Sequence, residues 1–250
     1  MKKKLTRMIQ EFISCHDTEG LYRTPITGFA SVGNAKFSEL KKTAGKEHFL
    51  PWDLLSRAKS VMAYFIPFSE RLVKSNIGGK FASREWAYSY IKTNQLISEL
   101  NSLLWRELAE SGYRAAVIPA THNFDKKSLI SRWSHRHIAF ICGLGSFGIN
   151  NMLITESGCC GRLGSIVSNM PVGEESHHTE EACLFKINGS CGVCVKKCTP
   201  GALDTSGFNR FSCYEICLEN AEYHNSIGFA DVCGKCLVGL PCSLRNPVKA

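Results

Sequence analysis

The sequence contains no continuous run of about eighteen apolar residues, which is the length that a membrane-spanning helix needs. It also shows no secretory leader, because polar and charged side chains interrupt residues 5–13, directly after the basic start. Low-complexity tracts are absent as well. We therefore expect a cytoplasmic protein with no membrane partner, in which thiols stay reduced and a disulfide framework does not form.

Acidic residues are too few to balance the basic ones. Lys and Arg number 30 and Asp and Glu 22, so the formal net charge over 250 residues is +8. This excess permits an anionic partner or cofactor without defining one, and we expect Lys41 and Lys42 to be ordinary exposed charges. The hydrophobic fraction of 44% is sufficient for a packed core.

Cysteine, by contrast, is abundant, and nine of the thirteen cysteines lie within residues 183–242. In the ferredoxin pattern C-x2-C-x2-C-x3-C-P, three cysteines hold one iron–sulfur cluster and the last ligates a second cluster. Cys191, Cys194 and Cys198 match the second, third and fourth positions of this pattern. The spacing therefore predicts an electron-transfer module with two clusters.

Two ligands of this pattern are displaced. Regular spacing would place the first cysteine at Asn188, so Cys183 is the expected substitute. Cys242, directly after Pro241, is the expected crossing ligand of the second motif. The prediction is two sets of four thiolates: Cys183, Cys191, Cys194 and Cys242 for the first cluster, and Cys198, Cys213, Cys233 and Cys236 for the second, with Cys217 as the alternative to Cys213.

Zinc is the alternative to iron and sulfide, because paired C-x2-C units also build structural zinc sites. A closed zinc site needs four thiolates and no crossing ligand, whereas a third cysteine follows each pair here. We therefore favour two 4Fe-4S clusters and expect residues 179–250 to form a ferredoxin-like module.

The preceding residues, up to 178, are expected to form an α/β (α+β) domain. Residues 60–66 are predicted as a buried strand because they are apolar and β-rich. Apolar residues three and four apart predict an amphipathic helix over residues 85–110, and residues 115–119 are predicted as a second buried strand. The polar loop 120–125 follows at a strand end, where open α/β sheets bind ligands.

Three glycines, Gly143, Gly145 and Gly148, follow a predicted helix over residues 138–142. A dinucleotide-binding G-x-G-x-x-G follows a strand instead, so this context does not support such a site. We expect the glycines to permit a tight turn or the close approach of a flat, bulky ligand.

Two further strands are predicted over residues 152–155 and 162–168, joined by a turn. This turn contains the vicinal pair Cys159 and Cys160. Because no second cysteine pair lies nearby in the sequence, we do not predict a redox or metal site there.

The order of these features resembles the epoxyqueuosine reductase family over about residues 28–247. The features that carry the resemblance are Leu50-Pro51, Arg57-Ala-Lys-Ser-Val61, Pro67, Gly143-Leu-Gly145 and the cysteine module. The family is related to reductive dehalogenases and corrinoid-handling proteins. The resemblance implies that the α/β domain binds cobalamin and that two 4Fe-4S clusters supply it with electrons.

Two departures from the family pattern affect the expected substrate. The family carries an Asp-Ser-Ala-Pro proton donor before the glycines, where this chain has Lys127-Ser-Leu-Ile-Ser-Arg-Trp, with Asp125 out of register. The family also continues into helical repeats that hold the tRNA anticodon stem, whereas this sequence stops at Ala250. We therefore expect a short form of the family and do not favour a tRNA substrate.

The resemblance and the polar residues together suggest a site. The residues expected to bind the corrinoid are Thr121, His122, Arg136, Gly143, Gly145 and Gly148. The expected proton donors are His135, His137 and Asp125, with His122 and Tyr90 as further candidates, because a reductive reaction consumes protons.

Two functions remain open. The first is a corrinoid-dependent reductase of a small molecule, which receives electrons from a ferredoxin or flavodoxin. The second is a ferredoxin-like carrier or reductive activator of a partner corrinoid protein, without a substrate of its own. The size of the predicted α/β domain favours the enzyme, since two clusters alone need far less protein.

Overall fold

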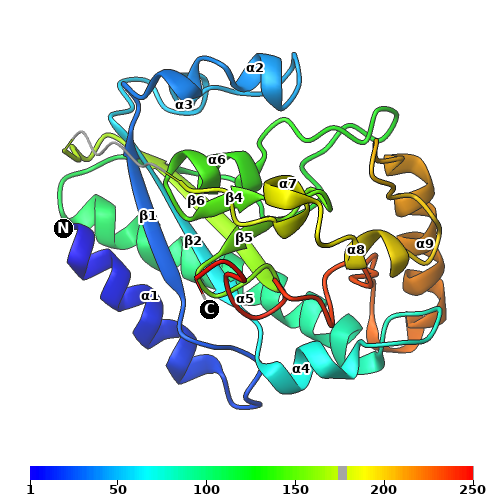
Figure 1. Cartoon of the computed structure of the whole chain (residues 1–250). Helices are drawn as coiled ribbons and strands as arrows, with labels where there is room; N and C mark the ends of the chain where they lie inside the picture. The colour runs from blue at the N-terminus through cyan, green and yellow to red at the C-terminus, as the bar shows by residue number, and fades with distance from the viewer. Residues whose placement is uncertain (174–178, 250) are drawn as a thin grey trace.

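A four-stranded antiparallel sheet forms the centre of the protein (Figure 1). The computed structural model describes residues 1–173 and 179–249. The strand order is β1-β2-β6-β3, and every neighbouring pair is antiparallel. The strands are β1 (Ile26–Ser31), β2 (Ser60–Pro67), β3 (Ala115–Val117) and β6 (Gly161–Ser168).

Strand β2 is buried on both faces, because its side chains alternate between two cores. From Val61 onwards, its odd-numbered residues pack with α6 (His135–Ile141) and Trp133. Its even-numbered residues pack with α1 (Lys2–His16) and α5 (Arg84–Glu110). Figure 1 shows α1 and α5 on one side of the sheet and α6 on the other. The sheet is therefore the middle layer of three.

Shorter elements complete the fold. A second, two-stranded antiparallel sheet consists of β4 (Gly145–Phe147) and β5 (Leu153–Thr155). Around the central sheet lie η1 (Ala35–Phe37), α2 (Leu40–Thr43), α3 (Pro51–Leu54) and α4 (Glu70–Ser75). The cysteine-rich segment contains α7 (Leu184–Asn188), α8 (Val193–Lys196), α9 (Arg210–Tyr223) and η2 (Asn225–Ile227).

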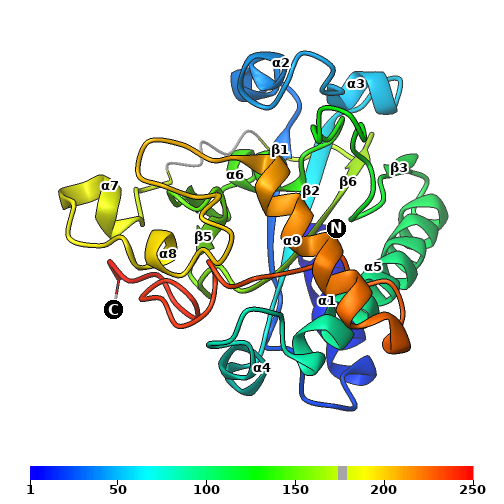
Figure 2. The ribbon, with the colours of Figure 1, turned by 90° about the vertical axis from the view of Figure 1, so that its right-hand side faces the viewer.

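The cysteine-rich segment is tied to the rest of the chain by polar contacts. Arg23 donates to the carbonyl of Leu244 at 3.0 Å, and the Asn220 amide oxygen accepts from the backbone N–H of Ala82 at 2.5 Å. Figure 2 shows α9 in front of the body of the protein, with α7 and α8 beside it. The predicted domain boundary after residue 178 lies outside the described residues.

Several sequence predictions are confirmed. The predicted strand over residues 60–66 is β2, and the predicted helix over residues 85–110 is α5, which Ser83 caps by accepting from the N–H of Trp86. Strands are also found where residues 152–155 and 162–168 were expected.

Other details of the prediction are wrong. The sheet is antiparallel, so the rule for ligand sites at the ends of parallel strands does not apply to it. Strand β3 is an edge strand with Val117 40% exposed, because only β6 pairs with it. Helix α6 begins three residues earlier than predicted, where Ser134 provides its N-cap.

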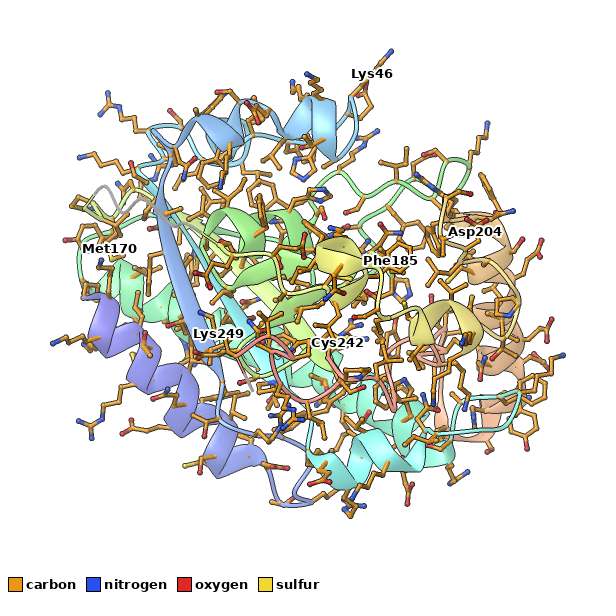
Figure 3. All side chains as sticks on the ribbon, in the orientation of Figure 1. Lys46, Met170, Phe185, Asp204, Cys242 and Lys249 are labelled. Carbon is orange, nitrogen blue, oxygen red and sulfur yellow. The ribbon has the colours of Figure 1, made fainter. Side chains whose placement is uncertain are left out.

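The surface is charged where the sequence suggested. Lys41 and Lys42 are exposed, and Figure 3 shows Lys46, nearby in the chain, projecting away from the body of the protein. Among the residues that the structure describes, no helix combines the length and the hydropathy that crossing a bilayer requires.

Strand β1 approaches the C-terminal end of α6 very closely at Gly28. A Cβ atom at this position would lie 2.2 Å from the carbonyl oxygen of Cys142. The Cys142 oxygen is a backbone atom, and the backbone of β1 fixes where the Cβ would lie, so a side chain there must displace the strand or the helix.

We expect Gly28→Ala to lower the free energy of unfolding by about 1–3 kcal/mol, the usual cost of overpacking. Chemical denaturation measures this change. Gly207→Ala is the matched control, since a Cβ at Gly207 meets no atom within 4 Å. An equal loss of stability in both variants would contradict the steric explanation.

Candidate iron–sulfur and cofactor site

Four cysteines of the C-terminal segment surround one small cavity. They are Cys183, Cys191, Cys194 and Cys242. Cys183 caps α7 and Cys194 lies in α8, and both are buried. Apolar side chains, including Ile154 and Leu240, complete the wall. The structure thus brings together the four thiols predicted for the first cluster.

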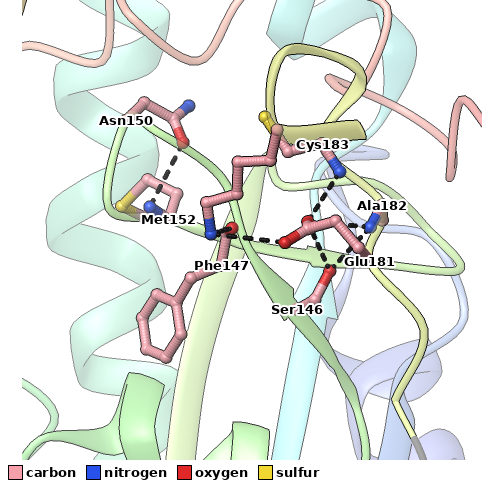
Figure 4. A network of polar contacts seen from close by, with 8 residues as sticks. Ser146, Phe147, Asn150, Met152, Glu181, Ala182 and Cys183 are labelled. Atoms are coloured by element: carbon pink, nitrogen blue, oxygen red, sulfur yellow. Dashed lines mark hydrogen bonds and ion pairs between the residues drawn. The ribbon is translucent and has the colours of Figure 1, made fainter. Parts of the chain in front are cut away.

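Glu181 holds the displaced ligand, Cys183, in place (Figure 4). One oxygen of its carboxylate accepts from the backbone N–H groups of Ala182 and Cys183, each at 2.9 Å. The other oxygen lies 3.4 Å from the Lys186 ammonium, and Ser146 donates to the carboxylate at 3.3 Å. This network fixes the start of α7, so Cys183 faces the cavity although it lies five residues before the regular position.

A second, larger cavity is surrounded by five thiols. They belong to Cys198, Cys213, Cys217, Cys233 and Cys236. Lys235 fixes the C-x2-C turn, because its buried ammonium donates to the carbonyls of Asn76 and Gly78 at 3.0 and 2.6 Å. The four thiols predicted for the second cluster, and the alternative at Cys217, all lie here.

The two thiol sets have the chemistry to hold iron–sulfur clusters or single metal ions, since thiolates bind both. Within residues 1–173 and 179–249, no three Cys, His, Asp or Glu side chains lie close enough together to hold a metal ion. Burial raises the pKa of Cys194 to about 11, so metal binding there must displace a proton.

The five-thiol cavity adjoins a third cavity beside the sheet. Five residues contribute to the walls of both cavities: Thr121, Phe124, Met152, Gly161 and Arg162. A ligand at this shared wall would contact the central sheet and the cysteine-rich segment together.

A polar chain lies beside these two cavities. Tyr90, on α5, donates to the buried carboxylate of Asp231 at 2.6 Å and lies 3.0 Å from the Thr121 hydroxyl. The half-exposed ring of His122 contacts the same carboxylate at 3.0 Å. Burial raises the pKa of Tyr90 to about 12, and its hydroxyl is protonated at neutral pH.

Arg162 adds a positive charge beside this chain. Its guanidinium lies 4.8 Å from the centre of the Tyr90 ring, and one of its terminal nitrogens donates to Asn94. Its buried Nε has no hydrogen-bond partner within the described part of the chain. A buried donor without a partner is costly, so this atom is suited to an oxygen acceptor of a bound ligand.

The predicted proton donors are placed differently. His135 reaches the third cavity, but its two ring nitrogens contact Ser165 Oγ at 2.8 Å and the Pro119 carbonyl at 3.0 Å. Burial lowers the pKa of His137 to about 4, and its Nδ1 contacts Ser134 Oγ. Asp125 caps a turn by accepting from residues 127–128, and these hydrogen bonds lower its pKa. All three side chains have structural partners.

The residues predicted to bind a corrinoid are divided between separate places. Thr121, His122 and Arg136 line the third cavity. Gly143 and Gly145 lie at another hollow near β1, and Gly148 lies at the first thiol cavity. A Cβ at Gly145 would lie 2.1 Å from the Ile154 carbonyl, so this glycine permits the pairing of β4 with β5.

Sequence reasoning missed Asp231 and Arg162. Asp231 stands two residues before Cys233, and Arg162 lies in a strand, and neither position carries a recognisable motif. The pair Cys159 and Cys160 is buried, and the backbone N–H of Cys159 donates to the Cys242 carbonyl at 2.9 Å.

The same arrangement of elements occurs in solved epoxyqueuosine reductases. The structure from Streptococcus thermophilus matches 99% of this chain at 16% identity with a TM-score of 0.56, and that from Bacillus subtilis matches 96% at 17% with a TM-score of 0.55. The chain has the epoxyqueuosine reductase fold. An epoxyqueuosine reductase solved with an epoxyqueuosine-modified tRNA stem loop also matches 96% of it, at 18% identity and a TM-score of 0.56.

The chain spans about two thirds of the epoxyqueuosine reductases it matches, namely 68% of the Streptococcus thermophilus protein and 66% of the other two. No protein-family model and no curated protein matches it. At these identities the likeness to the epoxyqueuosine reductases establishes the fold, and the chemistry depends on the cavities described above.

Burial of His135 predicts a pH dependence of stability. Burial lowers its pKa from 6.5 to about 4 in the folded protein. Between these values only the unfolded chain takes up the proton, so the free energy of unfolding falls as the pH drops from 6.5 towards 4. We expect His135→Gln to remove about 2 kcal/mol of the fall between pH 7 and pH 5. Denaturation at pH 7 and pH 5 measures it, and identical slopes in both proteins would contradict a buried neutral imidazole.

Proposed function

We propose that this chain is an iron–sulfur reductase. In this proposal each thiol-lined cavity holds one 4Fe-4S cluster, and the space that joins the second and third cavities holds a corrinoid. The observation that carries the proposal is that the five-thiol cavity, which Tyr90 also lines, shares a wall with the third cavity at Arg162, whose buried Nε is unpaired within the described residues. The fold shared with epoxyqueuosine reductases supports it.

Residues of this chain suit a large anionic or carbonyl-rich ligand. Arg162 Nε would donate to one of its oxygens, and Thr121, His122 and Arg136 lie on the same walls. When bound, a corrinoid supplies reducing chemistry at its cobalt, and buried thiolate-ligated clusters supply electrons at low potential. The apolar neighbours Phe124 and Met152 exclude water from the join between the two cavities.

Tyr90 is the proton donor that we propose, in place of the family's missing aspartate. Its Oη lies at the five-thiol cavity and would give its proton to the reduced substrate. Asp231 holds this hydroxyl in position. His122 is 46% exposed at its side chain and contacts Asp231, so it connects the buried carboxylate with solvent protons.

An electron carrier is the alternative, in which the chain passes electrons from one protein to another. A carrier needs clusters near its surface but no large space beside them. The third cavity and the polar chain beside it therefore favour the reductase. A ferredoxin or flavodoxin would be the electron donor under either proposal.

Metal and cofactor content tests the proposal directly. We expect protein reconstituted anaerobically with iron and sulfide to hold about eight irons and to change the spectrum of added cobalamin. We expect Cys194→Ala to lose about half of the iron, since Cys194 belongs to only one thiol set. Eight irons without a cobalamin shift would favour the carrier, and zinc in place of iron would overturn both proposals.

Replacement of the proposed proton donor tests the chemistry. Epoxyqueuosine, supplied as the free nucleoside and within a tRNA stem loop, is the first probe, and mass spectrometry detects its reduction. We expect Tyr90→Phe to slow product formation by about 100-fold or more, the usual contribution of a general acid, while iron and cobalamin binding stay unchanged. Tyr88→Phe, two residues away on α5 and bonded to Glu19, is the control. Equal rates in the two variants would exclude Tyr90 as the donor.

A further inference from the structure

The second thiol cavity has more thiols than a four-thiolate cluster needs. Cys198, Cys233 and Cys236 account for three of its thiols, and α9 contributes two more, from Cys213 and Cys217. A 4Fe-4S cluster bound by cysteines takes one thiolate on each of four irons. One thiol at this cavity is therefore surplus.

The two thiols on α9 are equivalent in position. Residues four apart lie on one face of a helix, and both side chains are partly buried at the same cavity. Each lies within electrostatic reach of Cys233, and the two thiols hydrogen-bond to each other.

Helix α9 is held at both ends, and both of its thiols line the cavity in this position of the helix. Asn209 caps its start by accepting from the N–H groups of Phe211 and Ser212. Near its end, the side chain of Asn220 accepts from Ala82 N–H and donates to Ile216 O.

We propose that Cys213 and Cys217 are interchangeable ligands, either of which completes the second cluster. This inference depends on the proposed function, because it requires the clusters. In an exchange, one iron–sulfur bond to Cys213 breaks and one to Cys217 forms. The proton of the Cys217 thiol passes to the released Cys213 sulfur, and no electron is transferred.

The iron content of single and double variants tests this exchange in the full-length, anaerobically reconstituted protein. We expect Cys213→Ala and Cys217→Ala each to keep about eight irons, and the double variant to keep about four. Low-temperature electron paramagnetic resonance of the reduced proteins identifies which cluster remains, and we expect a changed signal from the second cluster in Cys213→Ala. Cys15→Ala, an exposed cysteine on α1, is the control.

The outcomes separate this inference from the proposed function. Loss of about four irons in either single variant would show that one fixed cysteine is the ligand and would overturn the exchange. A double variant that keeps all its iron would also overturn it. If the wild-type protein itself bound no iron, the proposed function would fail first. Four irons retained in the double variant would show that the first site, and hence the fold, is intact.

Discussion

The burial of β2 on both faces is the constraint on which the rest of the structure depends. Its alternating side chains form two cores, and each core needs a covering layer. Helices α1 and α5 cover one face and α6 covers the other. This arrangement places Tyr90 of α5 and Arg162 of β6 beside the same space, although they are far apart in the sequence.

The cysteine-rich segment depends on this framework for its geometry. Its thiols are positioned by contacts with the body of the protein, such as the buried Lys235 ammonium on the carbonyls of Asn76 and Gly78. Glu181 performs the same task for Cys183. Burial raises the pKa of the Cys194 and Cys233 thiols, so any metal ion that binds them must displace their protons.

The polar chain beside the two cavities stabilises buried charged groups through hydrogen bonds and a cation–ring contact. Asp231 accepts from Tyr90 and contacts His122, while Arg162 lies over the Tyr90 ring and keeps one nitrogen unpaired. Unpaired buried donors are uncommon in folded proteins because they cost free energy. The unpaired Nε of Arg162 is consistent with a bound ligand that accepts a hydrogen bond from it, as the proposed reductase requires.

The sequence alone determined what depends on local spacing. Three features could be predicted from it: the apolar run of β2, the helical periodicity of α5 and the two groups of cysteines with iron–sulfur spacing. Each of these signals lies within a few neighbouring residues. Tertiary structure decided the rest. The antiparallel strand order, the engagement of both His135 nitrogens and the meeting of Tyr90 with Asp231 join residues that are distant in the chain. Only packing of the two cores brings such residues together, so no local pattern encodes them.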